Sequence, residues 1–144
     1  MKIRFRKLTP QAVEPKRGSR SAAAYDLTAT SVEHEIVNGM VVFTVHTGLA
    51  VEIPEGYYGD VRPRSSVYKT ACALSNGCGV IDSDYRGEIK GKFYLVGNDG
   101  GAMYEAGERC LQLIVSPTTE VEWEEAETLT ETTRGAGGYG STGN

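Results

Sequence analysis

Hydrophobic and polar residues alternate with a period of two along most of this chain, and helical periodicity is almost absent. Ile3 and Phe5 alternate with basic residues, and an apolar run over 41–45 follows Asn38-Gly39, a pair that favours a hairpin turn. Further strand candidates are residues 49–53, 57–61, 88–96, 110–115 and 121–124. Short strands separated by turn residues predict an all-β sandwich or barrel.

One short helix is expected beside these strands. The hydroxyl of Ser65 or Ser66 can cap its first turn, and the helix would run towards Ala73. We find no internal repeat and no second domain. The pattern therefore predicts a β domain over residues 1–127 and a polar, then glycine-rich, tail over residues 128–144.

The amino-acid composition limits which binding partners and which cellular compartment we expect for this protein. The 144 residues suit one domain, and a net charge of −4 without a Lys/Arg run argues against a nucleic-acid polymer as partner. No apolar run approaches the roughly 20 residues that a membrane span needs. Three cysteines without a C-x-x-C pair predict reduced thiols and a cytoplasmic setting, and two scattered histidines give no zinc site.

The C-terminal tail carries the first candidate for chemistry. From Arg134 it combines a guanidinium, many glycines, the ring of Tyr139 and the hydroxyls of Ser141 and Thr142. These groups suit a phosphate and a stacked base, although glycine-rich termini are also commonly plain flexible tails. The glycine spacing does not match a Walker A loop.

Two segments near the helix and the first strands carry isolated polar groups. Asp26 stands between apolar residues in Ala24-Tyr-Asp-Leu27, where it is either a turn residue or a ligand. Arg64 precedes Ser65 and Ser66 at the predicted helix start, where free N–H groups and a guanidinium could bind an anion.

Two further segments complete the set. Asp82 follows an apolar pair, so it is either a partly buried carboxylate that can act as general base for a water molecule or part of a solvated turn before a hairpin. Asn76 has the donors and the acceptor needed to read an amide-like base edge. Gln112 is the one polar residue inside the run Cys110-Leu-Gln-Leu113.

Taken in order, the five segments resemble the five motifs of the trimeric dUTP pyrophosphatases (dUTPases). The most specific parts are Gly79-Val-Ile-Asp82 with Asp84-Tyr-Arg-Gly87, and Arg134-Gly-x-Gly-Gly-Tyr-Gly-Ser-Thr-Gly143. The resemblance implies a jelly-roll-like β-clip barrel and a homotrimer whose active sites are shared between chains. It also implies hydrolysis of dUTP to dUMP and pyrophosphate with Mg²⁺, which limits uracil in DNA and supplies dUMP for thymidylate synthesis.

The resemblance also implies roles for single residues. Asp82 would activate the attacking water, Asn76 would read uracil together with backbone groups at Val80 and Ile81, and Tyr85 would exclude a 2′-hydroxyl. Lys90 falls at another nucleotide-contact position. The implied phosphate contacts are Arg64, Ser65, Ser66 and Gln112, with Arg134, Gly140, Ser141 and Thr142 on the γ-phosphate. Tyr139 would stack on uracil, and Asp26 would reach Mg²⁺ through water.

Two other functions remain open at this point. A dCTP deaminase shares the implied fold, but that family works through a Glu just after its third motif and lacks the closing tail. A nucleotide-gated binding protein could use the same pocket with hydrolysis only incidental. Pyrophosphate and ammonia release from dUTP and dCTP would separate the three functions.

Overall fold

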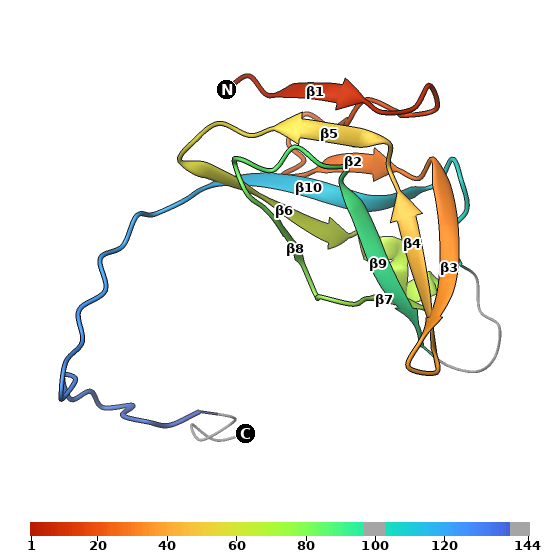
Figure 1. Ribbon diagram of the computed structural model, residues 1–144. Helices are drawn as coiled ribbons and strands as arrows, with labels where there is room; N and C mark the ends of the chain where they lie inside the picture. The colour runs from red at the N-terminus through yellow and green to blue at the C-terminus, as the bar shows by residue number, and fades with distance from the viewer. Residues whose placement is uncertain (97–102, 139–144) are drawn as a thin grey trace.

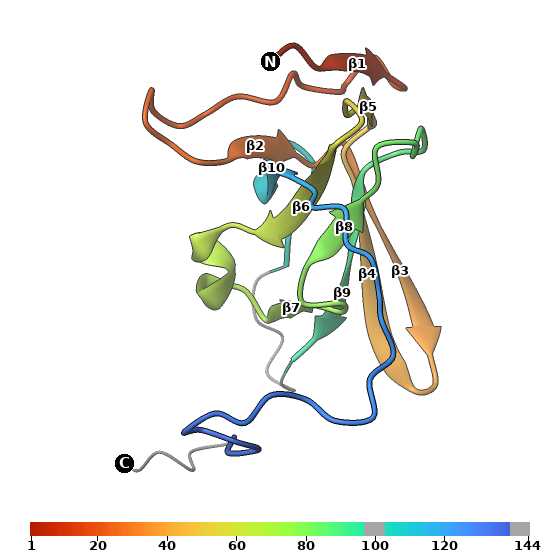
Figure 2. The same ribbon diagram turned by 90° about the vertical axis from the view of Figure 1, so that its left-hand side faces the viewer.

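The computed structural model describes residues 1–96 and 103–138, which form an antiparallel β structure with one short 3₁₀ helix (Figures 1 and 2). The strands are β1 (Arg4–Lys7), β2 (Tyr25–Thr28), β3 (Ser31–Val37), β4 (Met40–His46), β5 (Leu49–Glu52), β6 (Tyr57–Pro63), β7 (Cys72–Leu74), β8 (Gly79–Ile81), β9 (Lys90–Leu95) and β10 (Arg109–Pro117). The helix, η1, spans Ser65–Lys69. The all-β prediction is confirmed.

The strands form two four-stranded sheets and one small sheet. Their orders are β2-β10-β6-β8, β3-β4-β9-β7 and β1-β5. In Figure 1, β3, β4 and β9 run steeply while β10 and β5 lie nearly horizontal, so the strands of the two four-stranded sheets run in clearly different directions. Because β6 lies between β10 and β8, strands far apart in sequence become neighbours.

The core lies between the sheets and follows the period-two pattern. Leu27 on β2, Phe93 on β9 and Leu111 on β10 are fully buried. Along β9 buried and exposed residues alternate, as expected for a strand with one face on the core. Gly91 permits a close approach there, since a Cβ at this position would lie 2.9 Å from the Phe93 ring.

The hairpin prediction is confirmed and the helix prediction is partly wrong. Asn38 and Gly39 have φ values of 51° and 79° between β3 and β4. The helix has only five residues, and its N-cap is Arg64 with no side-chain capping bond, where we expected a serine hydroxyl. It cannot continue to Ala73, because β7 pairs there with β9.

The segment after β10 leaves the body (blue in Figures 1 and 2). It has no helix or strand over residues 118–138. The strand predicted at 121–124 is therefore absent in the single chain, where Val121 is 58 % and Trp123 90 % exposed. The domain boundary at residue 127 stays a prediction.

Two other expectations concern the cysteines and the membrane. Cys72, Cys78 and Cys110 are free thiols, as expected. Burial raises the pKa of Cys110 to about 12. Among the described residues no helix is long and apolar enough to cross a membrane.

The β3–β4 turn gives a test of the fold. Gly39→Ala should lower the free energy of unfolding by about 1–2 kcal/mol, because alanine is strained at positive φ. Gly18→Ala is the control, since a Cβ meets no atom within 4 Å at either position and Gly18 lies outside the left-handed region. Urea unfolding at one protein concentration measures both. Equal losses in the two variants would contradict the assigned turn.

Candidate functional site

The first group of expected site residues surrounds Asp26 on β2. Its Oδ1 accepts a hydrogen bond from Arg64 Nε at 2.8 Å, and its Oδ2 accepts one from Arg109 Nη1 at 3.0 Å. Gln112 lies directly opposite Asp26 in the β10–β2 pair and donates to the carbonyl of Pro63 at 3.0 Å. One carboxylate thus holds two guanidinium groups beside an amide.

A hollow of about 330 Å³ opens beside this group. Its lining consists of small residues with a few polar ones: Gly18, Ala22, Ala23, Ala24, Asp26, Arg64, Ser65, Gln112 and Ile114. Ser66 instead lines a second hollow of about 460 Å³ with Lys69 and Arg109. The two serines expected to hold phosphates therefore face different hollows in the single chain, while Arg64 lines both.

Sequence reasoning missed Arg109. It lies three residues before Gln112, so simple alternation places the two side chains on opposite faces of β10. A β-bulge changes this, because Cys110 and Leu111 together stand opposite Leu27. Arg109 is thereby paired with Thr28 and Gln112 with Asp26, on the same face. The two consecutive apolar residues Cys110-Leu111 after Arg109 were the available signal.

The acidic residues fit a hydrated metal ion better than a directly bound one. No group of three or more His, Cys, Asp or Glu within residues 1–96 and 103–138 could hold a metal. Both oxygens of Asp26 already accept hydrogen bonds from arginine. Mg²⁺ usually keeps several waters and takes few protein ligands, so contact through water suits this carboxylate.

The second group follows β7 and lies along β8. Asn76 lies in the turn that Gly77 closes with a φ of 67°. On β8, Val80 is 61 % exposed, while Ile81 packs against the core. Asp82 comes directly after β8, and its side chain is exposed. The expectation of a partly buried Asp82 is wrong for the single chain, since β8 is an edge strand with nothing beyond it in the described sheet.

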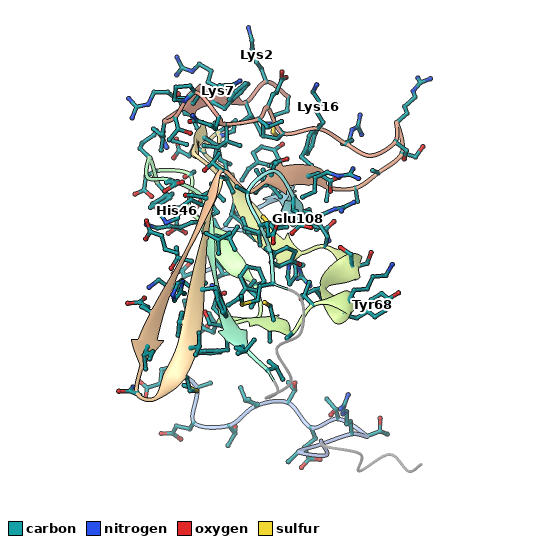
Figure 3. The ribbon with its side chains drawn as sticks, turned by 90° about the vertical axis from the view of Figure 1, so that its right-hand side faces the viewer. Lys2, Lys7, Lys16, His46, Tyr68 and Glu108 are labelled. Carbon is teal, nitrogen blue, oxygen red and sulfur yellow. The ribbon has the colours of Figure 1, made fainter. Side chains whose placement is uncertain are left out.

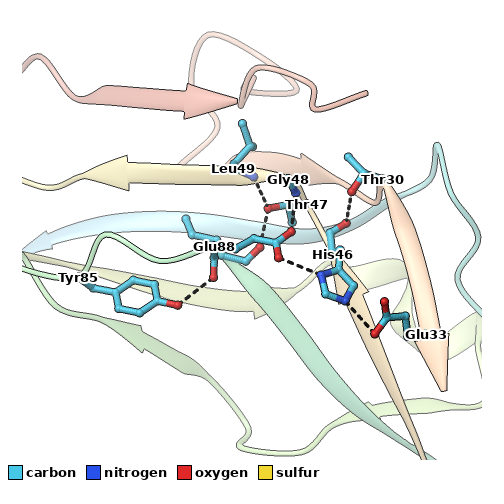
Figure 4. A network of polar contacts seen from close by, with 9 residues as sticks. Thr30, Glu33, His46, Thr47, Gly48, Leu49, Tyr85 and Glu88 are labelled. Atoms are coloured by element: carbon cyan, nitrogen blue, oxygen red, sulfur yellow. Dashed lines mark hydrogen bonds and ion pairs between the residues drawn. The ribbon is translucent and has the colours of Figure 1, made fainter. Parts of the chain in front are cut away.

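The loop after Asp82 places Tyr85 by short-range contacts. The Tyr85 N–H donates to the carbonyl of Asp82 at 3.1 Å, and its hydroxyl donates to the carbonyl of Glu88 at 3.0 Å (Figure 4). A Cβ at Gly87 would overlap the Tyr85 ring, so glycine at this position lets the ring lie over the backbone. Tyr85 remains 41 % exposed and presents a free aromatic surface.

Glu88 connects this loop to the end of β4. Its Oε2 accepts a hydrogen bond from His46 Nδ1 at 2.9 Å, and its Oε1 accepts one from the Gly48 N–H at 2.8 Å. Burial acts to raise the pKa of Glu88, but the hydrogen bonds from His46 and Gly48 outweigh it and the pKa lies below its ordinary value. Lys90, the first residue of β9, stands opposite His46 and is exposed.

The two groups lie far apart in one chain. Asp26 is on β2 and Val80 on β8, which are the opposite edges of the same four-stranded sheet. Three strand spacings separate these edges by roughly 14 Å. Figure 3 shows His46, whose ring contacts Glu88, on one side of the body and Tyr68 of η1 on the other.

The tail contributes little that can be placed against the body. Arg134 is exposed, and its Nε donates to the carbonyl of Gly137 at 2.9 Å, within the tail itself. The other expected tail contacts, Tyr139, Gly140, Ser141 and Thr142, lie outside the described residues.

The motifs and the fold agree with comparison to known proteins. A family model described as dUTPase matches residues 11–143. The chain belongs to the dUTPase family. The resemblance drawn from the sequence is therefore confirmed, and the family match favours this function over that of a dCTP deaminase.

Relatives and solved structures extend the match over nearly the whole chain. This dUTPase is 44 % identical over 144 residues to the deoxyuridine 5'-triphosphate nucleotidohydrolase of Wolinella succinogenes, covering 99 % of this chain and 95 % of that protein. It is 40 % identical to the enzyme of that name from Paramecium bursaria Chlorella virus 1, covering 96 % and 95 %. A mutant dUTPase of Staphylococcus bacteriophage 80alpha with dUpNHpp has a TM-score of 0.83 at 24 % identity, covering 99 % of both chains. The jelly-roll-like fold is confirmed.

The lowered pKa of Glu88 predicts an acid-sensitive contribution to stability. The ionised carboxylate stabilises the folded state above the ordinary pKa of 4.5, and this contribution is lost as the pH falls through the lower pKa of the folded state. Between about pH 5 and pH 3 the melting temperature should therefore fall more in the wild type than in Glu88→Gln. Glu55→Gln, at an exposed turn, is the control and should behave like the wild type. Identical profiles for wild type and Glu88→Gln would contradict the assigned network.

Proposed function

We propose that this dUTPase hydrolyses dUTP at the α-phosphate, with Asp82 activating the attacking water. The products are dUMP, a precursor for thymidylate synthesis, and pyrophosphate. The observation that carries the residue assignment is the single turn in which the Tyr85 N–H donates to the Asp82 carbonyl at 3.1 Å. This turn fixes the backbone that carries the exposed Asp82 carboxylate and, three residues later, the exposed Tyr85 ring, which supports contact of both with one nucleotide.

The second group supplies base and sugar recognition in this proposal. Asn76 and the backbone at Val80 and Ile81 read the edge of uracil, for which an amide has the required donors and acceptor. Tyr85 lies under the deoxyribose, where its ring leaves no room for a 2′-hydroxyl. Lys90 adds a positive charge at the start of β9.

The first group supplies phosphate recognition. Arg64, Ser65 and Gln112 line one hollow and Ser66 the other, so together they can contact several phosphate oxygens. Arg109 joins them, since it shares Asp26 with Arg64. Asp26 would hold Mg²⁺ through water, and the ion would offset charge on the triphosphate.

A homotrimer would bring the groups together. The two groups stand at opposite edges of one sheet, so a nucleotide that spans both needs the first group of one copy and the second group of another. In the single chain Val80 is 61 % and Trp123 90 % exposed. Such exposed apolar side chains support the proposal that contacts with other copies bury them. In the third copy, Arg134, Gly140, Ser141 and Thr142 would close on the γ-phosphate and Tyr139 on uracil.

The role of Asp82 is tested by removing its charge. Asp82→Asn keeps the shape of the side chain but cannot take a proton from water, so turnover of dUTP should fall by roughly 10²–10⁴-fold. Pyrophosphate release measures turnover, and ammonia release from dCTP checks for deamination. Binding of dUpNHpp should persist. Glu55→Gln, which removes an exposed carboxylate elsewhere, is the control. Turnover within a few-fold of wild type would show that Asp82 is not the base.

The shared site is tested by mixing two defective proteins. Asp82→Asn protein and protein truncated after Thr133 should each be nearly inactive. After reversible dissociation and reassembly, mixed trimers contain sites with an intact Asp82 from one chain and an intact tail from another, so activity should return. Reassembly of each parent alone is the control. Verified mixed trimers without activity above the parents would argue against a site built from several chains.

A further inference from the structure

We propose that His46 and Glu88 are positioning residues for sugar recognition, fixing the Tyr85 ring against which the deoxyribose would lie. The inference rests on the proposed function, because it concerns how the same site selects dUTP over UTP. Neither residue touches the nucleotide in this scheme. Both act through the backbone that carries Tyr85 and Lys90.

Tyr85 depends on the position of residue 88. Its hydroxyl donates to the Glu88 carbonyl at 3.0 Å, and its ring lies over Gly87. The ring is 41 % exposed, so surrounding side chains do not enclose it. Its orientation is therefore set mainly by these local contacts, and a shift of the Glu88 carbonyl moves the ring.

Residue 88 in turn depends on the segment between β4 and β5 (Figure 4). His46 and the Gly48 N–H donate to the two carboxylate oxygens of Glu88, at 2.9 and 2.8 Å. The Thr47 hydroxyl donates to the Ile89 carbonyl at 2.5 Å, and the Ile89 N–H donates to the Leu49 carbonyl at 2.8 Å. Two bonds hold the Glu88 side chain and two hold the backbone at Ile89.

Because Glu88 and His46 are largely buried, the hydrogen bonds of the Glu88 side chain contribute to holding this segment in place. The side chains of His46 and Glu88 are only 18 % and 20 % exposed, so water cannot readily replace either partner. An ionised carboxylate only accepts hydrogen bonds, and Nδ1 of His46 therefore carries the hydrogen. Its Nε2 is buried without a hydrogen-bond partner in the described structure and lies 3.5 Å from the exposed Glu33 carboxylate. The imidazole is thus oriented mainly by Glu88.

The same pair sets the start of β9. Lys90 stands opposite His46 in the β4–β9 register, two residues after Glu88. When the Glu88 carboxylate is removed, the Ile89 bonds remain and the sheet is kept. The turn from Tyr85 to Glu88 loses the two side-chain bonds of Glu88 and keeps one backbone anchor, since the Glu88 carbonyl and the Ile89 N–H belong to the same peptide group. Sugar recognition should therefore suffer more than folding.

The test compares discrimination between dUTP and UTP. We expect His46→Ala and Glu88→Ala to lower the ratio of kcat/KM for dUTP over UTP by about 10- to 100-fold, the scale of a misplacement near 1 Å. Tyr85→Ala removes the ring itself and shows, for comparison, the complete loss of discrimination between dUTP and UTP. Glu88→Gln should retain most of the discrimination, because its carbonyl accepts from Gly48 and its amide can donate to the other histidine tautomer.

Glu35→Ala is the matched control. Glu35 pairs with Lys92 at 2.8 Å on the same sheet, but it does not touch residues 85–90 in the described contacts. A purely structural role for His46 and Glu88 would lower the melting temperature and leave the ratio unchanged. If Glu88→Ala does not fold, His46→Ala decides the matter, since it leaves the Gly48–Glu88 bond in place.

The outcomes separate this inference from the proposed function. A wild-type ratio in folded His46→Ala and Glu88→Ala, with a loss in Tyr85→Ala, would overturn this inference alone. Wild-type protein without dUTP hydrolysis would overturn the proposed function and the inference with it. If Tyr85→Ala left the ratio of kcat/KM for dUTP over UTP unchanged, the role of the ring would be overturned. The positioning role of His46 and Glu88 would be overturned with it.

Discussion

β10 and β6 separate the two edges of the four-stranded sheet, and the distance between the two groups of candidate site residues depends on that separation. β2 at one edge carries Asp26, and β8 at the other leads to Asp82. The pairing of β6 with both neighbours fixes the distance, because hydrogen-bonded strands have a nearly constant spacing. Within one chain the two groups therefore stand roughly 14 Å apart, which supports the proposed sharing of a site between copies.

The group around Asp26 is ordered by charge. Two guanidinium groups share one carboxylate, and the aspartate keeps them close despite their like charges. Arg109 is 56 % and Arg64 27 % exposed, so one arginine lies more open to solvent than the other. An incoming triphosphate would meet a group of donors that is already oriented, which reduces the ordering that binding must supply.

The sequence predicted best where local rules decide the structure. Asn38-Gly39 specified a turn because both residues tolerate positive φ, and the apolar run over 41–45 lies within β4, but β3 was not among the expected strands. β7 was missed because a helix start at Ser65 was extended through Ala73, whereas pairing with β9 decides that segment. β2 was missed for a related reason, since its short run around Asp26 is stabilised by β10 from the far end of the chain.

The site could be predicted only as a set of motifs. The order of the segments around Asp26, Arg64, Asp82 and Gln112 indicated the family, but it did not give their distances. The exposure of Asp82 depends on the edge position of β8, which is a tertiary property. The contact of Arg109 depends on a register shift that alternation does not reveal.

That register shift accommodates one extra buried residue in β10. Cys110 and Leu111 are both fully buried, and together they replace the single residue that regular pairing would place opposite Leu27. With only one residue between Arg109 and Gln112, regular pairing would also place these two side chains on the same face, because they would lie two positions apart. Homologous chains can therefore keep both contacts with Asp26 in two ways, with two buried residues and the bulge or with one buried residue and regular pairing.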